Sequence, residues 1–185
     1  MAERKVKGTM LVDQVKLIRG NKGMDWSKYL KEEDWVAINK RILPSEWYPL
    51  ELYRRCGLAT FHVLGQGNLD IVRLRGQIRG KELFAGVYKT AIIPQDPMTT
   101  LSRFIMLYSQ LFNFSNLKFE NVGKDHAKIF HDYDRNDPVT KPYCYQLMGH
   151  FDVIIEIAGG KNVKIEFLAK QWEGAATTIF DITWE

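Results

Sequence analysis

A short acidic segment has the spacing that opens a calcium-binding loop. Asp132, Asp134 and Asn136 match the first three ligand positions of such a loop. Its sixth position is Asp137, where the loop needs glycine, and its twelfth is Tyr143, where it needs a glutamate. The pattern therefore indicates a solvated turn.

Two glycine-containing segments come close to phosphate-binding motifs and fail their requirements. The Gly65-Gln66-Gly67 segment lacks the third glycine of a dinucleotide fingerprint and follows an expected helix. The segment 76–81 (GQIRGK) is one residue short of a phosphate loop and has no preceding strand. Neither segment predicts a nucleotide site.

The histidines and cysteines are few and scattered. The four histidines are His62, His126, His131 and His150, and the two cysteines are Cys56 and Cys144. His126 and His131 fall on opposite faces of one expected strand, so they cannot grip one metal ion together. Two distant cysteines build no zinc cluster, and we expect both to be buried thiols. No nucleophile–base pair can be named, so we expect no enzymatic activity, no metal site and no cofactor.

Aromatic residues are unusually frequent, with five Trp, eight Tyr and ten Phe. Several come from segments expected to converge beside a sheet, where an apolar pocket with polar tips is one outcome and a solid core is the other. The candidate pocket residues are Trp47, Tyr48, Phe61, His62, Tyr108, Phe112, His150, Phe151 and Trp172.

Charge is unevenly distributed along the chain. Residues 1–95 carry 17 Lys and Arg against 10 Asp and Glu, and residues 96–185 carry 9 against 12. This polarity favours an anionic partner or head-to-tail pairing of two copies, and is too mild to predict nucleic-acid binding. A basic cluster of Arg73, Arg75, Arg79 and Lys81 is either a surface for an anion or partner, or a solvated face.

The elements that must position these residues follow from hydrophobic period. Helical spacing predicts helices near 10–19, 26–40, 47–64, from 68, 81–89, 97–112 and 143–158. Alternation predicts two hairpins, over 117–131 and 162–184. Gly149 interrupts the last helix and indicates a close approach of helix to sheet. The order predicts an α+β fold, with a helical layer on one face of a roughly four-stranded antiparallel meander sheet.

Length and composition limit the organisation of the chain. A chain of 185 residues fits a flexible extension over 1–8 and one domain over 9–185. No apolar run approaches a membrane span, and the first residues do not form a signal peptide. We therefore expect a cytoplasmic protein.

Three segments resemble a known family. The segment 42–49 (ILPSEWYP) is similar to an LPxxWYP segment of a poorly characterised, myxobacterial-type bacterial family. Asp96-Pro97 and the segment 149–160 also look similar, and the resemblance covers about 9–184. That family belongs to the superfamily of 4-vinyl-reductase-like and haem-nitric-oxide-binding-like sensor domains. The resemblance implies an α+β sensor domain that often dimerises and holds a small hydrophobic molecule or haem between helices and sheet.

Two departures from the superfamily restrict this expectation. Related domains place zinc-binding cysteines in the last hairpin, and the segment 162–184 has none. Haem sensors carry a Tyr-x-Ser-x-Arg contact, and Tyr108-Ser109 lacks that spacing. Zinc and haem are both disfavoured. The sequence favours a non-enzymatic sensor with a small apolar ligand, acting as a homodimer; the alternative is an interaction scaffold or adaptor with a solid core and a protein partner.

Overall fold

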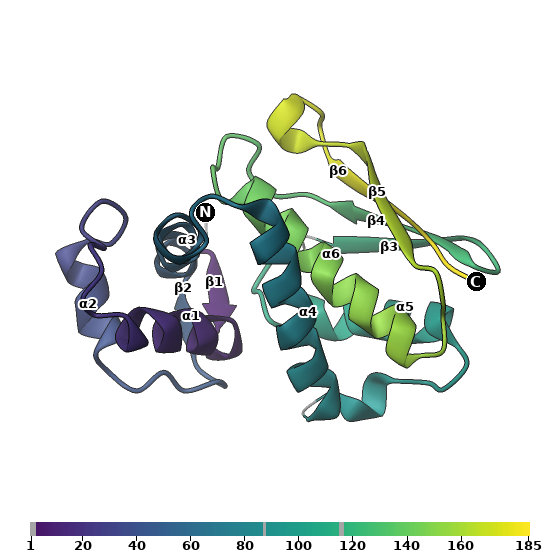
Figure 1. The fold of residues 1–185 in the computed structure, drawn as a ribbon, viewed down its shortest axis with the longest axis horizontal. Helices are drawn as coiled ribbons and strands as arrows, with labels where there is room; N and C mark the ends of the chain where they lie inside the picture. The colour runs from purple at the N-terminus through teal and green to yellow at the C-terminus, as the bar shows by residue number, and fades with distance from the viewer. Residues whose placement is uncertain (1–2, 87, 115–116) are drawn as a thin grey trace. The chain divides into compact units, whose positions relative to one another are not determined.

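The computed structural model describes residues 3–86, 88–114 and 117–185. The chain forms two compact units, which we describe separately (Figure 1). Unit 1 comprises Met1–Asn68 and Gln110–Ser115, and unit 2 comprises Leu69–Ser109 and Asn116–Glu185. Whether the chain acts as the single domain expected over 9–185 stays a prediction.

Unit 1 is mainly helical. Its elements are β1 (Lys5–Lys7), α1 (Gly8–Gly20), α2 (Glu32–Ile38), β2 (Trp47–Pro49), α3 (Leu50–Ala59) and the π-helix η1 (Thr60–Leu64). The inward face of α1 consists of Leu11, Val15 and Ile18, spaced three and four residues apart. These side chains are buried, as the helical period predicted.

Within the flexible extension expected over 1–8, residues 5–7 form strand β1. β1 pairs antiparallel with β2, with Val6 opposite Tyr48, and Val6 is fully buried. The burial of this apolar side chain in a long-range strand pair explains the difference. β2 also replaces the beginning of the helix expected from Trp47, because Pro49 favours an extended conformation at the residue before it.

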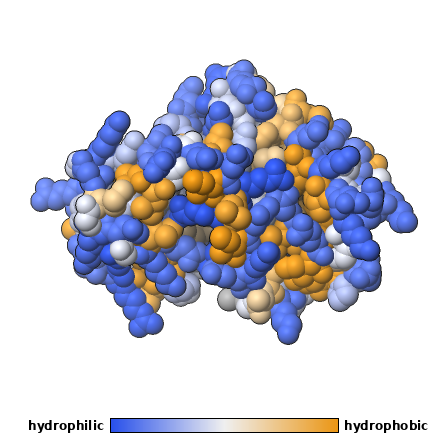
Figure 2. All heavy atoms as spheres, in the orientation of Figure 1, coloured by the Kyte–Doolittle hydropathy of each residue, from blue (hydrophilic) through white to orange (hydrophobic). Residues whose placement is uncertain are grey.

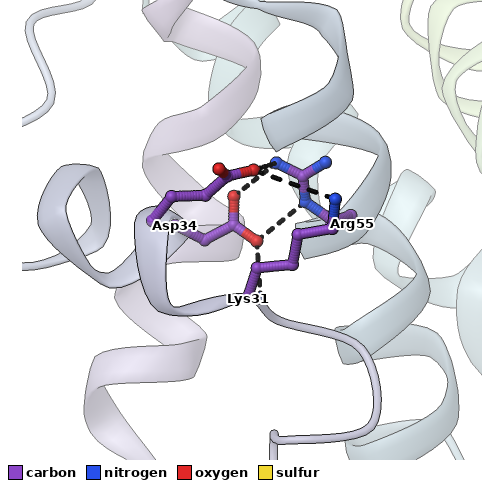
Figure 3. A network of polar contacts seen from close by, with 4 residues as sticks. Lys31, Asp34 and Arg55 are labelled. Carbon is purple, nitrogen blue, oxygen red and sulfur yellow. Dashed lines mark hydrogen bonds and ion pairs between the residues drawn. The ribbon is translucent and has the colours of Figure 1, made fainter.

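A buried ion pair joins α2 to α3 in unit 1 (Figure 3). The carboxylate of Asp34, 2% exposed, accepts hydrogen bonds from Arg55 Nε at 2.8 Å and Nη2 at 2.7 Å. The backbone N–H of Lys31 also donates to it, at 2.9 Å, which caps the first turn of α2. Three donors therefore compensate the burial of this carboxylate.

Unit 2 packs helices against a sheet. Its elements are α4 (Leu69–Ala85), η2 (Lys89–Ala91), α5 (Pro97–Ser109), β3 (Leu117–Gly123), β4 (His126–His131), α6 (Thr140–Ile157), β5 (Lys164–Ala169), η3 (Gln171–Glu173) and β6 (Thr178–Thr183). The sheet is antiparallel and four-stranded, which confirms the α+β fold class. Its order is β3-β4-β6-β5. The last strand, β6, therefore lies next to β4, β5 lies at the edge, and the sheet is not a simple meander.

Helices α4 and α6 of unit 2 lie side by side at very short range (Figure 1). A methyl group added at Gly149 of α6 would overlap the carbonyl oxygen of Arg73, and one added at Gly76 of α4 would overlap that of Gln146. The close approach expected at Gly149 is therefore real, but its partner is a helix and not the sheet. Glycine is required here because the two backbones touch.

Aromatic rings fill the layer between helices and sheet in unit 2. The rings of Phe84, Phe104, Phe151, Phe180, Phe167 and Trp172 follow one another with centroid separations of 5.6, 6.1, 5.4, 5.0 and 5.2 Å. Offset and edge-to-face pairs at such distances add stability beyond their burial. Within the described ranges, no helix is both long enough and apolar enough to cross a membrane.

Candidate functional site

A cluster of polar side chains is buried in unit 2. His131 is the last residue of β4, Tyr143 and Cys144 lie near the beginning of α6, and Tyr108 lies near the end of α5. The Tyr108 and Tyr143 hydroxyl oxygens are 2.6 Å apart, and the His131 ring centroid is 5.2 Å from that of Tyr143. His131 points inward because Ala127 and Ile129 occupy the buried positions of the same strand at period two. We call these four residues the tyrosine–histidine cluster.

Cys144 and His131 form the one thiol–imidazole pair of this cluster. Cys144 Sγ is 3.5 Å from His131 Nδ1, and both residues are fully buried. Burial lowers the pKa of His131 to about 3 and raises the pKa of the Cys144 thiol. Both groups are therefore neutral near pH 7. A nucleophilic cysteine needs the thiolate, so this geometry does not activate Cys144.

The opposite nitrogen of the His131 ring is buried without a partner among the described residues. A buried polar atom left unpaired costs about 1–3 kcal/mol, unless water or a ligand pairs with it. Gln171 binds the backbone next to this cluster. Its Oε1 accepts a hydrogen bond from the Tyr133 N–H at 3.2 Å, and its Nε2 donates one to the Ala176 carbonyl at 3.0 Å. The Tyr133 ring stacks on His131 at 5.7 Å. The cluster thus offers one hydrogen-bonding position inside an aromatic shell.

His150 of α6 is a second buried histidine in unit 2. It is 2% exposed, and neither ring nitrogen has a partner in the part of the chain that the structure describes. Its ring lies 6.2 Å from that of Phe104 and packs near Gly80 of α4. Burial, aided by the charge of Arg79, lowers its pKa to about 4. His150 is a neutral imidazole enclosed by apolar groups.

The four histidines do not fit the role of a haem-iron ligand. An iron ligand needs a free ring nitrogen facing a wide apolar slot. His131 is covered by Tyr133 and Tyr143, and His150 is packed between helices.

The other two histidines fit haem no better. His126 Nε2 lies 2.7 Å from Asp181 Oδ1 on the outer face of the sheet. His62 is exposed, with its ring flat against Tyr29 at 4.9 Å.

The nine pocket candidates from the sequence fall in both units. Trp47, Tyr48, Phe61, His62 and Phe112 belong to unit 1, and Tyr108, His150, Phe151 and Trp172 belong to unit 2. In unit 2, the Phe104 ring contacts three of them: Tyr108 at 5.2 Å, His150 at 6.2 Å and Phe151 at 6.1 Å. The prediction of one shared pocket stays a prediction.

Sequence reasoning missed three members of the tyrosine–histidine cluster, His131, Tyr143 and Cys144, and also the neighbouring Tyr133 and Gln171. Alternation along β4 was the available signal for His131, since it shares a face with Ala127 and Ile129. Gln171 gave no local signal, because its partners lie up to 39 positions away.

The basic cluster is partly used inside unit 2. Arg73 donates two hydrogen bonds of 2.8 Å to the buried carboxylate of Asp152, and Gln77 donates a third at 2.8 Å. Arg79 pairs with Glu82 at 3.0 Å. Arg73 and Arg79 therefore have carboxylate partners within the unit, and the anion or partner surface expected for Arg73, Arg75, Arg79 and Lys81 stays a prediction.

Comparison with known proteins identifies the fold. No protein-family model and no curated protein matches this chain. Solved H-NOX domains match it in structure. The S. oneidensis protein in the Fe(II)NO ligation state has a TM-score of 0.65 at 13% identity, covering 97% of this chain and 99% of that one.

Two other H-NOX structures agree with the first. A point mutant of the T. tengcongensis H-NOX has a TM-score of 0.62 at 17% identity, covering 97% of each chain. Unliganded Fe(II) K. algicida H-NOX has a TM-score of 0.65 at 9% identity, covering 97% of this chain and 96% of that one. These similarities show an H-NOX-like fold, and so confirm that part of the resemblance.

Proposed function

We propose that this chain is a non-enzymatic sensor domain that binds a small ligand without haem. The observation that carries this proposal is the extent of the shared fold, which covers 97% of this chain and 96–99% of the H-NOX chains compared. Those structures include one in the Fe(II)NO state and one that is Fe(II) unliganded. The neutral Cys144–His131 pair supports a binding role over catalysis.

The ligand that suits the tyrosine–histidine cluster is small, neutral and mostly apolar. The rings of Tyr133 and Tyr143 pack against His131, whose Nε2 has no partner among the described residues. A charged guest would meet no opposite charge from the neutral imidazole and thiol. One hydrogen-bonding group on the guest would pair with that nitrogen and relieve its desolvation. The ligand class is therefore an apolar molecule with a single donor or acceptor.

Two measurements on the purified protein test the proposal. Titration with hemin is expected to give no shifted Soret band, whereas a 1:1 complex with one would overturn the haem-free role. Native mass spectrometry and thermal-shift screening of small phenols, alcohols and ketones are expected to find a stabilising ligand. His131→Leu should abolish that shift, and His62→Leu, on the surface of unit 1, should retain it.

An adaptor that functions through its surface is the second candidate. The unbroken row of aromatic rings from Phe84 to Trp172 favours it, since a well-packed layer leaves little room for a guest. Screening that yields no ligand, with no small molecule carried through purification, would reject the ligand-binding role and leave the adaptor. Whether the domain dimerises is part of either role.

A further inference from the structure

A chain of hydrogen bonds reaches His131 from the last hairpin of unit 2. Thr178 of β6 is opposite His131 of β4 in the sheet, and both side chains are fully buried. The Thr178 hydroxyl oxygen accepts a hydrogen bond from the backbone N–H of Gln171 at 3.1 Å. The same side chain is hydrogen-bonded to Cys144, whose sulfur is 3.5 Å from His131 Nδ1. Two side chains thus connect a backbone donor to one nitrogen of the imidazole.

The direction of these hydrogen bonds follows from the hydrogens that each group carries. Since the Thr178 oxygen accepts from Gln171, its own hydrogen points to the sulfur. Burial raises the pKa of the Cys144 thiol, and the Thr178 contact lowers it in part, as a donor to the sulfur does. Sulfur is a weak acceptor, and a thiol carries a single hydrogen. That hydrogen has its partner in His131 Nδ1.

The thiol contact decides which nitrogen of His131 carries hydrogen. Burial lowers the pKa of His131 to about 3, so the ring is neutral near pH 7 and has one hydrogen. When Nδ1 accepts from the thiol, that hydrogen is on Nε2. The opposite tautomer would direct two hydrogens at the weakly accepting sulfur of Cys144. Nε2, which has no partner among the described residues, is therefore a donor.

We propose that Cys144 makes His131 Nε2 a hydrogen-bond donor, so that the tyrosine–histidine cluster selects an apolar carbonyl compound over a ligand that offers only a donor. This inference rests on the proposed function and narrows its ligand class to acceptors. A guest with only an N–H or O–H donor would meet the hydrogen on Nε2, and both donors would stay unpaired. Cys144 is thus a positioning residue, which acts on the ligand through the imidazole.

Nuclear magnetic resonance of the ligand-free protein with isotopically labelled histidine tests the tautomer at pH 7. Long-range proton–nitrogen correlations distinguish a protonated ring nitrogen from a bare one, and the signal lost in His131→Leu identifies this ring. We expect Nε2 to be protonated and Nδ1 to be bare. His131 protonated on Nδ1 in the wild type would overturn the proposal.

Three cysteine variants test the cause of the tautomer. Cys144→Ala should move part of the population to protonated Nδ1, whereas Cys144→Ser keeps a donor and should retain the wild-type spectrum. Cys56→Ala removes the buried thiol of unit 1, so it is the matched control and should leave His131 unchanged. An unchanged spectrum in Cys144→Ala would show that the thiol does not set the tautomer.

Matched probes test the selectivity by calorimetric titration. Acetophenone offers one acceptor and no donor, α-methylstyrene has nearly the same shape without the acceptor, and indole offers one donor. Acetophenone should bind at least about tenfold more tightly than either of the others, because it alone pairs with Nε2. Apolar probes can also bind the surface, since Leu74 and Ile78 are 54% and 53% exposed and Figure 2 shows hydrophobic side chains among hydrophilic ones. The binding of α-methylstyrene measures this background.

The variants then connect the selectivity with the tautomer. Cys144→Ala should reduce the preference for acetophenone over indole at least about threefold, and Cys144→Ser should retain it; thermal melting verifies that both are folded. Equal binding of acetophenone and indole to the wild type, or an unchanged preference in Cys144→Ala, would overturn this proposal and leave the proposed function standing. A ligand screen without any hit would reject the proposed function instead, while the ligand-free spectrum would still decide the tautomer.

Discussion

Unit 1 and unit 2 each hold a buried aspartate against two nitrogens of one arginine, but the two ion pairs play different roles in packing. In unit 1, Asp34 and Arg55 join α2, only seven residues long, to α3. In unit 2, Asp152 and Arg73 sit beside glycines that already bring α4 and α6 into backbone contact. The comparison suggests that unit 1 depends on a side-chain link, whereas unit 2 depends on the absence of side chains.

The strongest test of this difference adds a single methyl group to unit 2. Gly149→Ala would force α6 away from α4, because the new carbon would overlap the Arg73 carbonyl oxygen. We expect a loss of at least about 4 kcal/mol in the free energy of unfolding, measured by urea denaturation. Gly20→Ala, in the last turn of α1, has open space around it and is the matched control. A loss below about 1 kcal/mol would show that the helices can separate freely.

Removing each arginine sharpens the comparison. Arg55→Ala leaves Asp34 buried with the Lys31 N–H as a remaining donor, and should cost about 3 kcal/mol in unfolding free energy. Arg73→Ala should cost about 2 kcal/mol, because its side chain is 34% exposed against 20% for Arg55, and Gln77 still donates to Asp152. A larger loss for Arg73 would reverse the assignment of roles.

Acid should weaken unit 2 before unit 1. His131 and His150 have folded pKa values of about 3 and 4, below an unfolded value near 6.5, so the unfolded state binds more protons as pH falls. The stability that the two neutral histidines contribute to the folded state is fully present above pH 6.5. It is lost as the pH falls toward their folded pKa values of about 3 and 4. Each should cost about 2 kcal/mol between pH 6.5 and 5.

Hydrogen exchange measured on peptides at pH 7 and pH 5 compares the acid sensitivity of the two units. Peptides from β4 and α6 should lose protection at pH 5, while those from α1 and α3 should not. His150→Leu should remove about half of the pH effect. Equal loss of protection in both units would contradict the assignment to buried histidines.

The smallest expected effect concerns the tyrosine pair. Tyr108→Phe removes the 2.6 Å hydroxyl contact with Tyr143 and should lower the unfolding free energy by about 1 kcal/mol. Tyr29→Phe, in unit 1 beside His62, should change it by less than about 0.5 kcal/mol. Thermal denaturation compares the stability of the two variants. Equal melting temperatures would show that the buried hydroxyl contact does not stabilise the fold.

Local period predicted much of unit 2 and less of unit 1. Alternation near 163–167 and 178–184 correctly indicated β5 and β6, and helical spacing located α6 within a few residues. β1 and β2 were not predicted, because a three-residue strand has too few positions to show a period. The two strands also pair over a separation of about 40 positions.

The candidate site was harder to predict than the fold. His150 was named from its neighbours, but the contact of Cys144 with His131 depends on how a helix crosses a strand. The partner of Gly149 was misassigned for the same reason, since a glycine signals a close approach without identifying what approaches it. Long-range packing decides such contacts, and local sequence patterns do not contain it.

The irregular edges of the sheet bear on how this protein behaves when concentrated. β3 and β5 are its outer strands, and each loses its regular register, between Asn121 and Gly123 and between Phe167 and Ala169. A bulged edge twists away from a neighbouring strand and resists the strand addition that begins fibril growth. Storage at high concentration should therefore not yield fibrils that bind amyloid dyes.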